Sequence, residues 1–271
     1  MRRFRTLIWS RYRENGRDLP WRKSRTPYRV LVSEFMLQQT GVERVRDKYR
    51  QFLRAFPSVR ALAVAEPREV LAVWKGLGYN RRALALKRAA EIIVAEHRGR
   101  VPHDIGSLTA LPGVGPATAC AVLAYAFNEP VAFIETNIRR VYIHFFFPGA
   151  RTVADSEILP LVEKTLDRGN PREWYDALMD FGTVLRRAGD DPNRRGARYR
   201  RQPPFEGSVR QVRGLVLGAL LQAPRLSEPR LAAVTAAKST LLAKALSQLV
   251  SEGFLVRQRG GYRITSGSPA R

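Results

Sequence analysis

Apolar side chains recur at helical spacing through most of residues 1–185, and short Pro or Gly breaks separate one run from the next. The first run covers residues 2–17 and has the i, i+3, i+4 spacing of an amphipathic helix. A further helix is expected from Pro27 through about Gln39. We see no convincing alternation with the period of a strand in this part of the sequence. The pattern therefore predicts a mainly α fold.

The pattern changes after a polar, basic stretch at residues 187–204, which we interpret as a linker. Helices are predicted over residues 209–221, 227–234 and 239–252. Residues 254–265 then alternate around Gly260-Gly261, which is typical of a β-hairpin. Helices followed by such a hairpin resemble a winged helix-turn-helix, a module that contacts either DNA or protein. The predicted domains are residues 1–203, including the linker, and a small α+β domain at 207–268.

The charge of the chain narrows the class of partner. Its 271 residues carry 47 Lys and Arg against 24 Asp and Glu, a formal net charge of +23. A general preference for Arg in the proteome would explain why Arg outnumbers Lys, but it would not explain why basic residues outnumber acidic ones. Arg pairs bidentately with phosphate and stacks on bases, so we expect a nucleic acid partner. Without a long apolar run or a secretory signal after Met1, we expect a cytoplasmic protein, nucleoid-associated if bacterial, that does not enter a membrane. We also expect a monomer.

One tight turn between two helical runs carries the first candidate chemistry. Residues 108–127 predict a short helix, a turn at Pro112-Gly113-Val114-Gly115, and an Ala-rich helix from about Pro116. Free backbone N–H groups at such a helix start form an anion site suited to phosphate. Taken alone, a Gly-x-Gly turn is more typical of an ordinary corner between helices.

Four other motifs occur in a fixed order around this turn. They are Leu-Pro-Trp-Arg at residues 19–22, Ser-Glu-Phe-Met-Leu-Gln-Gln-Thr at 33–40, Trp-Lys-Gly-Leu-Gly-Tyr at 74–79 and Ala-Leu-Met-Asp-Phe-Gly at 177–182. Together with the turn they resemble the helix-hairpin-helix (HhH-GPD) DNA glycosylases, in particular the adenine glycosylase branch. The resemblance covers roughly residues 1–185 and implies a two-lobed helical fold. It also implies base excision repair by flipping a mispaired base, most often adenine opposite 8-oxoguanine or guanine, and hydrolysing its N-glycosidic bond.

Glu34 is the candidate proton donor. It lies among apolar residues, so it is either on the one wet face of a helix or desolvated, and desolvation raises the pKa of a carboxyl group. The resemblance favours the second reading, because Glu34 falls where the adenine glycosylases hold the Glu that protonates the adenine ring.

Glu135 is the candidate for the second carboxylate. It stands where the superfamily has a catalytic Asp that stabilises the oxocarbenium charge on the sugar. A plain helix-start acid is the alternative reading. Asn137 matches an Asn near that site, which we expect to orient the carboxylate. Because Glu is one methylene longer than Asp, both the mechanism and the substrate stay open at this point.

The resemblance also assigns DNA contacts and a base pocket. The DNA-contacting residues would be Gln38, Gln39, Tyr79, Gly113, Val114, Gly115 and Thr118, with Gln38 wedging into the duplex and Tyr79 intercalating. A plain hydrophobic corner is the alternative for Tyr79. The base pocket would include Trp21, Arg22 and Asp176.

This sequence lacks two kinds of residue that other members of the family use, a nucleophilic Lys and the Cys ligands of an iron–sulfur cluster. Ala117 stands where bifunctional members have a nucleophilic Lys, so we expect no strand cleavage. Iron–sulfur members carry four Cys after the helix that holds Asp180, whereas this chain has Arg186 at the first of those positions. Its one cysteine, Cys120, is expected to be a small buried hydrophobe. We therefore expect no iron–sulfur cluster and no other metal.

Two rival functions stay open. The first is excision of another base, such as thymine or uracil opposite guanine, or a deaminated or alkylated purine. The second is a non-catalytic damage-binding protein, against which a buried acid argues. The residues after the linker are also too few for the further domain with which adenine glycosylases recognise 8-oxoguanine.

Overall fold

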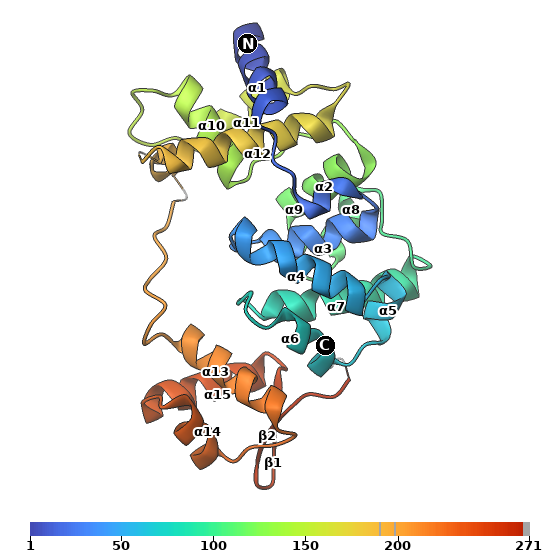
Figure 1. Cartoon of the computed structure of the whole chain (residues 1–271), viewed down its shortest axis with the longest axis vertical. Coiled ribbons are helices and arrows are strands. Elements are labelled where there is room, and N and C mark those ends of the chain that lie inside the picture. Colours follow the sequence, from blue (N-terminus) through green and yellow to red (C-terminus); the bar gives the residue numbers. More distant parts are fainter. Residues whose placement is uncertain (190, 198, 268–271) are drawn as a thin grey trace. The chain divides into compact units, whose positions relative to one another are not determined.

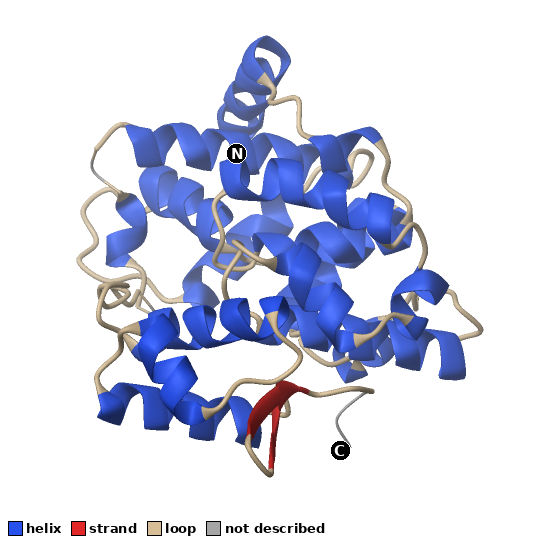
Figure 2. Ribbon diagram, turned by 60° about the horizontal axis from the view of Figure 1, so that its bottom comes forward, coloured by secondary structure: helices blue, strands red, loops and turns tan. Residues whose placement is uncertain are grey.

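The computed structural model describes residues 1–189, 191–197 and 199–267, and it is built almost wholly of helices. Figure 2 shows that the strands are confined to one hairpin near the C-terminus. The prediction of a mainly α fold with this hairpin is confirmed. Within the part of the chain described, no helix is long and apolar enough to cross a membrane.

The chain folds into two compact units, each made of two separate segments. Unit 1 comprises residues 1–34 and 101–201, and unit 2 comprises residues 35–100 and 202–271. This division differs from the predicted domains of 1–203 and 207–268. Those boundaries stay a prediction, and positions 190, 198 and 268 lie outside the described residues.

Unit 1 carries the first helices and the middle of the chain (Figure 1). Its elements are α1 (Arg2–Asn15), α2 (Pro20–Lys23), most of α3 (Pro27–Leu37), α8 (Ile105–Ala110), α9 (Pro116–Val122), the π-helical turn η1 (Leu123–Phe127), α10 (Thr136–Phe146), α11 (Asp155–Thr165), α12 (Pro171–Arg187) and the 3-10 turn η2 (Pro192–Arg195). Helix α12 packs against both α1 and α10. Phe4 of α1 lies with ring centroids 5.5 Å from Tyr142 and 6.0 Å from Trp174, so aromatic burial holds the three helices together.

Unit 2 joins a helical segment to the C-terminal module. Its elements are the end of α3, α4 (Val42–Ala55), α5 (Val59–Val64), α6 (Pro67–Trp74), α7 (Arg81–Glu96), α13 (Val209–Gln222), α14 (Glu228–Thr235), α15 (Ser239–Ser251), β1 (Leu255–Gln258) and β2 (Gly261–Ile264). The strands pair antiparallel, with Leu255 opposite Ile264. Glu252, after α15, accepts from the guanidinium groups of both Arg81 in α7 and Arg213 in α13. These two arginines hold the pKa of Glu252 at about 2, although its burial acts in the opposite direction.

The first half of the predicted basic linker is folded onto unit 1. Arg140, in α10, pairs with Asp191 at 2.6 Å, and the arginine side chain is only 3% exposed. Arg195 donates to the carbonyl of Phe147 at 2.6 Å and so satisfies the C-terminal end of α10. The backbone of Val153 bonds to residues on both sides of Gly196. Residues 191–197 are therefore a folded part of unit 1.

Candidate active site

The predicted turn between α8 and α9 is present and has a defined backbone. Gly113 has a φ of 80°, a left-handed conformation that suits glycine. The N–H of Val114 donates to the carbonyl of Leu111 at 3.1 Å, and the valine side chain is buried. Gly115 is the N-cap residue of α9, and apart from its chain neighbours no described atom lies within 4 Å of where its Cβ would be. With Thr118 in the first turn of α9, these residues leave room for close approach of a phosphate to the backbone.

Glu34 is the accessible side chain in an otherwise buried part of α3. The apolar residues around it are buried, namely Val30, Leu31, Val32, Phe35 and Met36, whereas Glu34 itself keeps part of its surface accessible. Burial, together with the charges of Glu135 and Asp176, raises the pKa of Glu34 to about 8. The carboxyl group therefore holds a proton at neutral pH and is a suitable general acid.

Glu135 caps the start of α10. Its Oε1 accepts the backbone N–H groups of Asn137 at 2.6 Å and of Ile138 at 3.1 Å. Burial raises the pKa of Glu135, although these two hydrogen bonds and the charge of Arg140 oppose the effect. Among the described residues no hydrogen bond is made to Oε2. The helix-start reading is thus correct for one oxygen, and the other is available to stabilise positive charge.

Asn137 orients the Glu135 carboxylate with its backbone rather than its side chain. The side-chain Oδ1 instead accepts a hydrogen bond from Arg140 at 2.5 Å. A Cβ at Gly182, in α12, would lie 2.6 Å from both Cβ and the carbonyl oxygen of Asn137. The glycine therefore permits α12 to approach the start of α10, which fixes the position of the capping carboxylate.

Asp176 lies beside the two glutamates and belongs to a buried ion-pair network. It is 4% exposed, pairs with Arg22 at 2.9 Å and also bonds to Arg25. Arg22 bonds in addition to Asp180 at 2.7 Å. Burial raises the pKa of Asp176 although both arginines oppose it. The two Nη groups of Arg22 are thus engaged by Asp180 and by the carbonyls of Arg17 and Asp176 rather than free for a base. Trp21 is its partly exposed neighbour in α2.

Tyr125 is a member of this cluster that sequence reasoning missed. It lies in η1 and is 8% exposed. The guanidinium carbon of Arg25 lies 5.8 Å from the centroid of its ring. Burial raises the pKa of the Tyr125 hydroxyl well above its usual value, and the charges of Asp176, Glu34 and Glu135 add to this. A tyrosine inside an Ala-rich run was the one available signal, because its neighbours in sequence are small.

Unit 2 holds the residues predicted to enter the duplex. Tyr79 has a φ of 48°, and the guanidinium carbon of Arg82 lies 5.3 Å from its ring centroid. Arg82 is buried and donates to the carbonyls of Phe35, at 2.8 Å, and of Gln38. Gln39, with a φ of 54°, is exposed. One arginine thus fixes both the turn after α3 and the turn that carries Tyr79.

The hydroxyl of Tyr79 also contacts the C-terminal segment of unit 2. The amide of Gln202 donates to it, and Arg210 Nη1 lies 3.5 Å away. Tyr79 is therefore held at its polar end in this structure. Intercalation beside a base requires that these two contacts be given up or rearranged.

The residues of this chain do not fit a four-cysteine iron–sulfur cluster. Cys120 is the single cysteine, and it is half-buried in α9 rather than fully buried as expected. After α12 the structure has the Arg140–Asp191 pair and the capping Arg195 instead of thiolates. No group of three or more His, Cys, Asp or Glu that suits a metal ion occurs among the described residues.

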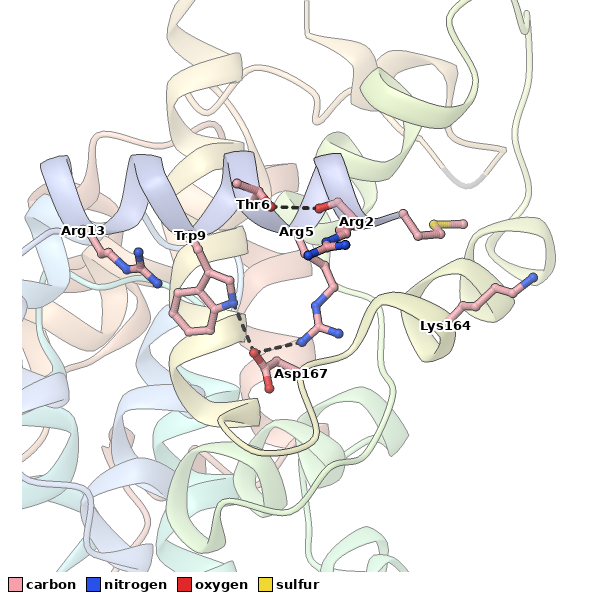
Figure 3. A pocket seen from close by; sticks show the side chains of 8 residues that line it. Arg2, Arg5, Thr6, Trp9, Arg13, Lys164 and Asp167 are labelled. Atoms are coloured by element: carbon pink, nitrogen blue, oxygen red, sulfur yellow. Dashed lines mark hydrogen bonds and ion pairs between the residues drawn. The ribbon is translucent and has the colours of Figure 1, made fainter.

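Unit 1 also carries a basic recess beside α1, with a volume of about 550 Å³. Figure 3 shows its cationic side chains, Arg2, Arg5, Arg13 and Lys164. Its one acid, Asp167, pairs with Arg5 at 3.0 Å and accepts from the indole of Trp9 at 3.2 Å. The acid is thereby neutralised, so the recess presents net positive charge.

Comparison with known proteins agrees with this geometry. The HhH-GPD superfamily of base excision DNA repair proteins matches residues 32–162. The adenine DNA glycosylase of Mycobacterium tuberculosis (strain CDC 1551 / Oshkosh) is 37% identical over 243 residues, which cover 79% of this chain and 76% of that protein.

Solved structures show the same fold. A thermostable thymine-DNA glycosylase superposes with a TM-score of 0.61 at 28% identity, covering 68% of this chain and 86% of that one. A trapped endonuclease III–DNA covalent intermediate superposes with a TM-score of 0.58 at 19% identity, covering 68% and 84%. At 19% identity the second likeness shows the fold alone.

Proposed function

Because the chain belongs to the HhH-GPD superfamily of base excision DNA repair proteins, we propose that it is an adenine DNA glycosylase. It flips a mispaired adenine out of duplex DNA and hydrolyses the N-glycosidic bond. The observation that carries the proposal is Glu34, an accessible carboxyl group in a buried helix, protonated at neutral pH beside a second carboxylate, Glu135.

In the proposed reaction the two glutamates have different tasks. Glu34 donates its proton to the adenine ring, which makes the base a better leaving group, and general acid catalysis of this kind contributes about 10²–10⁴-fold. As the bond from the sugar carbon to nitrogen breaks, positive charge develops on the sugar, and Oε2 of Glu135 stabilises it. Water then adds to that carbon. The hydroxyl of this water stays on the sugar, and the other proton of the water returns to Glu34.

Two further features of the proposed enzyme depend on missing residues. Ala117 offers no amine to attack the sugar, so the product is an intact strand with an abasic site. The single cysteine cannot supply the ligands of an iron–sulfur cluster, so excision proceeds without one. The Arg140–Asp191 pair and Arg195 support the fold of the segment after α12 in its place.

A second substrate class competes with adenine. The likeness to a thymine-DNA glycosylase favours thymine, whereas the greater identity with an adenine glycosylase favours adenine. Duplexes that carry each mismatch distinguish the two when excision is followed by hot alkali, which breaks the strand at abasic sites. We expect adenine opposite 8-oxoguanine to be cut fastest.

The same duplex panel separates catalysis from binding. Glu34→Gln should retain duplex affinity within a few-fold and lose excision, because an amide cannot donate the proton. Excision of pyrimidines alone by the wild type would reject the adenine assignment. Tight binding of a damaged duplex without excision of any base would show a damage sensor instead.

A further inference from the structure

The basic recess beside α1 has no task in the reaction proposed above. Its volume of about 550 Å³ lies within the range of ligand pockets, but most such pockets have an apolar lining. Here four of the eight residues that line the recess are cationic, and Figure 3 shows them as Arg2, Arg5, Arg13 and Lys164. The kind of ligand that such a lining fits is an anion.

Three of these cations have no acid to neutralise them. Among the described residues Arg2, Arg13 and Lys164 form no ion pair, whereas Arg5 pairs with Asp167. Arg2 and Lys164 are exposed, so an anion from solution reaches them without any rearrangement of the fold.

The single acid of the recess, Asp167, already has partners on both carboxylate oxygens. Its Oδ2 accepts from the guanidinium of Arg5 and from the indole of Trp9. Its Oδ1 accepts from the backbone N–H groups of Gly169, at 3.2 Å, and of Asn170, at 3.3 Å. The carboxylate therefore stabilises the loop after α11 and leaves the other cations of the recess uncompensated.

The cations of α1 form a row along one face of the helix. Arg2, Arg5, Trp9 and Arg13 follow one another at intervals of three or four residues, which brings side chains to the same face. At about 1.5 Å per residue the helix rises by about 16 Å from Arg2 to Arg13. One strand of duplex DNA carries a phosphate about every 3.4 Å along its axis, so the row spans about five phosphates. A row of this length fits a linear polyanion better than a single phosphate.

The positive charge is not uniform along the row. A smaller recess of about 320 Å³ continues along α1 past Trp9, and it is lined by Arg13 and by a second acid, Glu173. Because Glu173 adds negative charge at that end, the positive potential is greatest at the other end. Figure 3 shows Arg2 and Lys164 there.

This recess is separate from the anion site expected at the turn between α8 and α9. Both belong to unit 1, and Figure 1 shows α1 well away from α8 and α9. The residues that line the recess also do not include Glu34 or Glu135. An anion in the recess therefore binds at a place that the reaction itself does not use.

We propose that this face of α1, with Lys164 of α11 across the recess, is a second site that binds the phosphate backbone of duplex DNA. The chain belongs to a superfamily of DNA repair proteins, so duplex DNA is the linear polyanion that it meets. The contact adds affinity that does not depend on sequence, because phosphate contacts carry no direct information about bases. It is independent of which base the enzyme removes.

The test is the double variant Arg2→Gln/Lys164→Gln, whose affinity for duplex DNA is measured by fluorescence anisotropy over a range of salt concentrations. The matched control is Arg3→Gln/Arg168→Gln. Arg3 and Arg168 are exposed, and they are close in sequence to residues of the recess but do not line it. Both variants lose two positive charges, so a difference between them does not come from net charge.

We expect Arg2→Gln/Lys164→Gln to lower the slope of log affinity against log salt by about 1.8, because each lost phosphate contact contributes about 0.9. The control should keep the wild-type slope. A wild-type slope in the recess variant would overturn the proposal. Equal losses in the two variants would also overturn it, because they would show an effect of total charge alone.

A local readout distinguishes a DNA strand from a single phosphate. Acetylation of Lys164 in the wild-type protein is followed by peptide mass spectrometry, with duplex DNA or with inorganic phosphate at the same phosphate concentration. Duplex DNA should slow the acetylation of Lys164, and inorganic phosphate should not. Equal protection by both, or protection by neither, would overturn the proposal.

The same readout separates this proposal from the proposed function. Protection of Lys164 by duplex DNA in a protein that excises no base would support the second backbone site and reject only the glycosylase. Excision of adenine without protection of Lys164 would reject only the second backbone site.

Discussion

Replacing Glu34 by glutamine should stabilise the fold, and the size of the gain should depend on pH. In the unfolded chain this carboxyl ionises near 4.5, whereas burial in the folded protein raises its pKa to about 8. Above pH 4.5 the unfolded state therefore binds fewer protons here than the native state. The contribution of Glu34 to the free energy of unfolding falls as pH rises through this interval.

The magnitude follows from the two ionisation constants. Each tenfold difference between these constants is worth about 1.4 kcal/mol. With pKa values of 4.5 and about 8, ionisable Glu34 lowers the free energy of unfolding of the wild type by up to about 4 kcal/mol at pH 7.5. Part of this is offset by the accessible surface of the side chain, and we expect about 2 to 4 kcal/mol. Glutamine has almost the same shape and no charge, so Glu34→Gln should recover this amount at pH 7.5 and none of it at pH 4.5.

Urea denaturation followed by tryptophan fluorescence, at intervals from pH 4.5 to pH 8, measures the difference between variant and wild type. The control is Glu96→Gln, which removes an exposed glutamate at the end of α7 and should give no gain that rises with pH. A difference for Glu34→Gln that is constant across the range would contradict the raised pKa. It would also remove the reason for assigning Glu34 as the acid.

Three further outcomes follow from the structure. Gly182→Ala should cost about 1–3 kcal/mol of stability and slow excision, because the added Cβ would lie 2.6 Å from Asn137. Thermal unfolding and single-turnover rates measure the two effects. The control is Gly214→Ala, because no neighbouring atom lies within 4 Å of the Cβ position at Gly214. Borohydride should trap no covalent adduct with abasic DNA, since Ala117 has no amine; a trapped adduct on a denaturing gel would show that another amine attacks. Arg259→Gln, in the exposed hairpin turn, should lower the slope of log affinity against log salt by about 0.9 if the hairpin contacts phosphate; an unchanged slope would assign this module to protein contact.

Helical periodicity located the main elements because burial of one face and Pro or Gly breaks are both local properties of the sequence. It predicted a helix over residues 2–17 and a turn at residues 112–115, and the structure has α1 at Arg2–Asn15 and a left-handed Gly113. Glu34 was recognisable for the same reason, because an acidic residue among apolar neighbours is unfavourable in a buried helix and can be seen in the local sequence.

Features that depend on distant partners were not recognisable. The π turn around Tyr125 shows no break in the apolar pattern, and its contact with Arg25 joins the two segments of unit 1, which are far apart in the sequence. The folded start of the linker needs Arg140 to neutralise Asp191, which joins residues from different elements. Asn137 was expected to orient Glu135, and it does so through its backbone N–H, a donor about which residue identity carries little information.

Because Glu135 caps α10, the same side chain affects both the stability of the fold and the proposed reaction. One oxygen of Glu135 holds the first turn of the helix, and the other faces the reaction as proposed. A mutation at this position therefore meets two selection pressures at once: a side chain without a hydrogen-bond acceptor, such as that of alanine, changes the rate and also loses the helix cap. Substitutions at Glu135 are thus limited to residues that can still cap α10, and other improvements have to come from residues that move the cap as a whole, such as those where α12 meets α10.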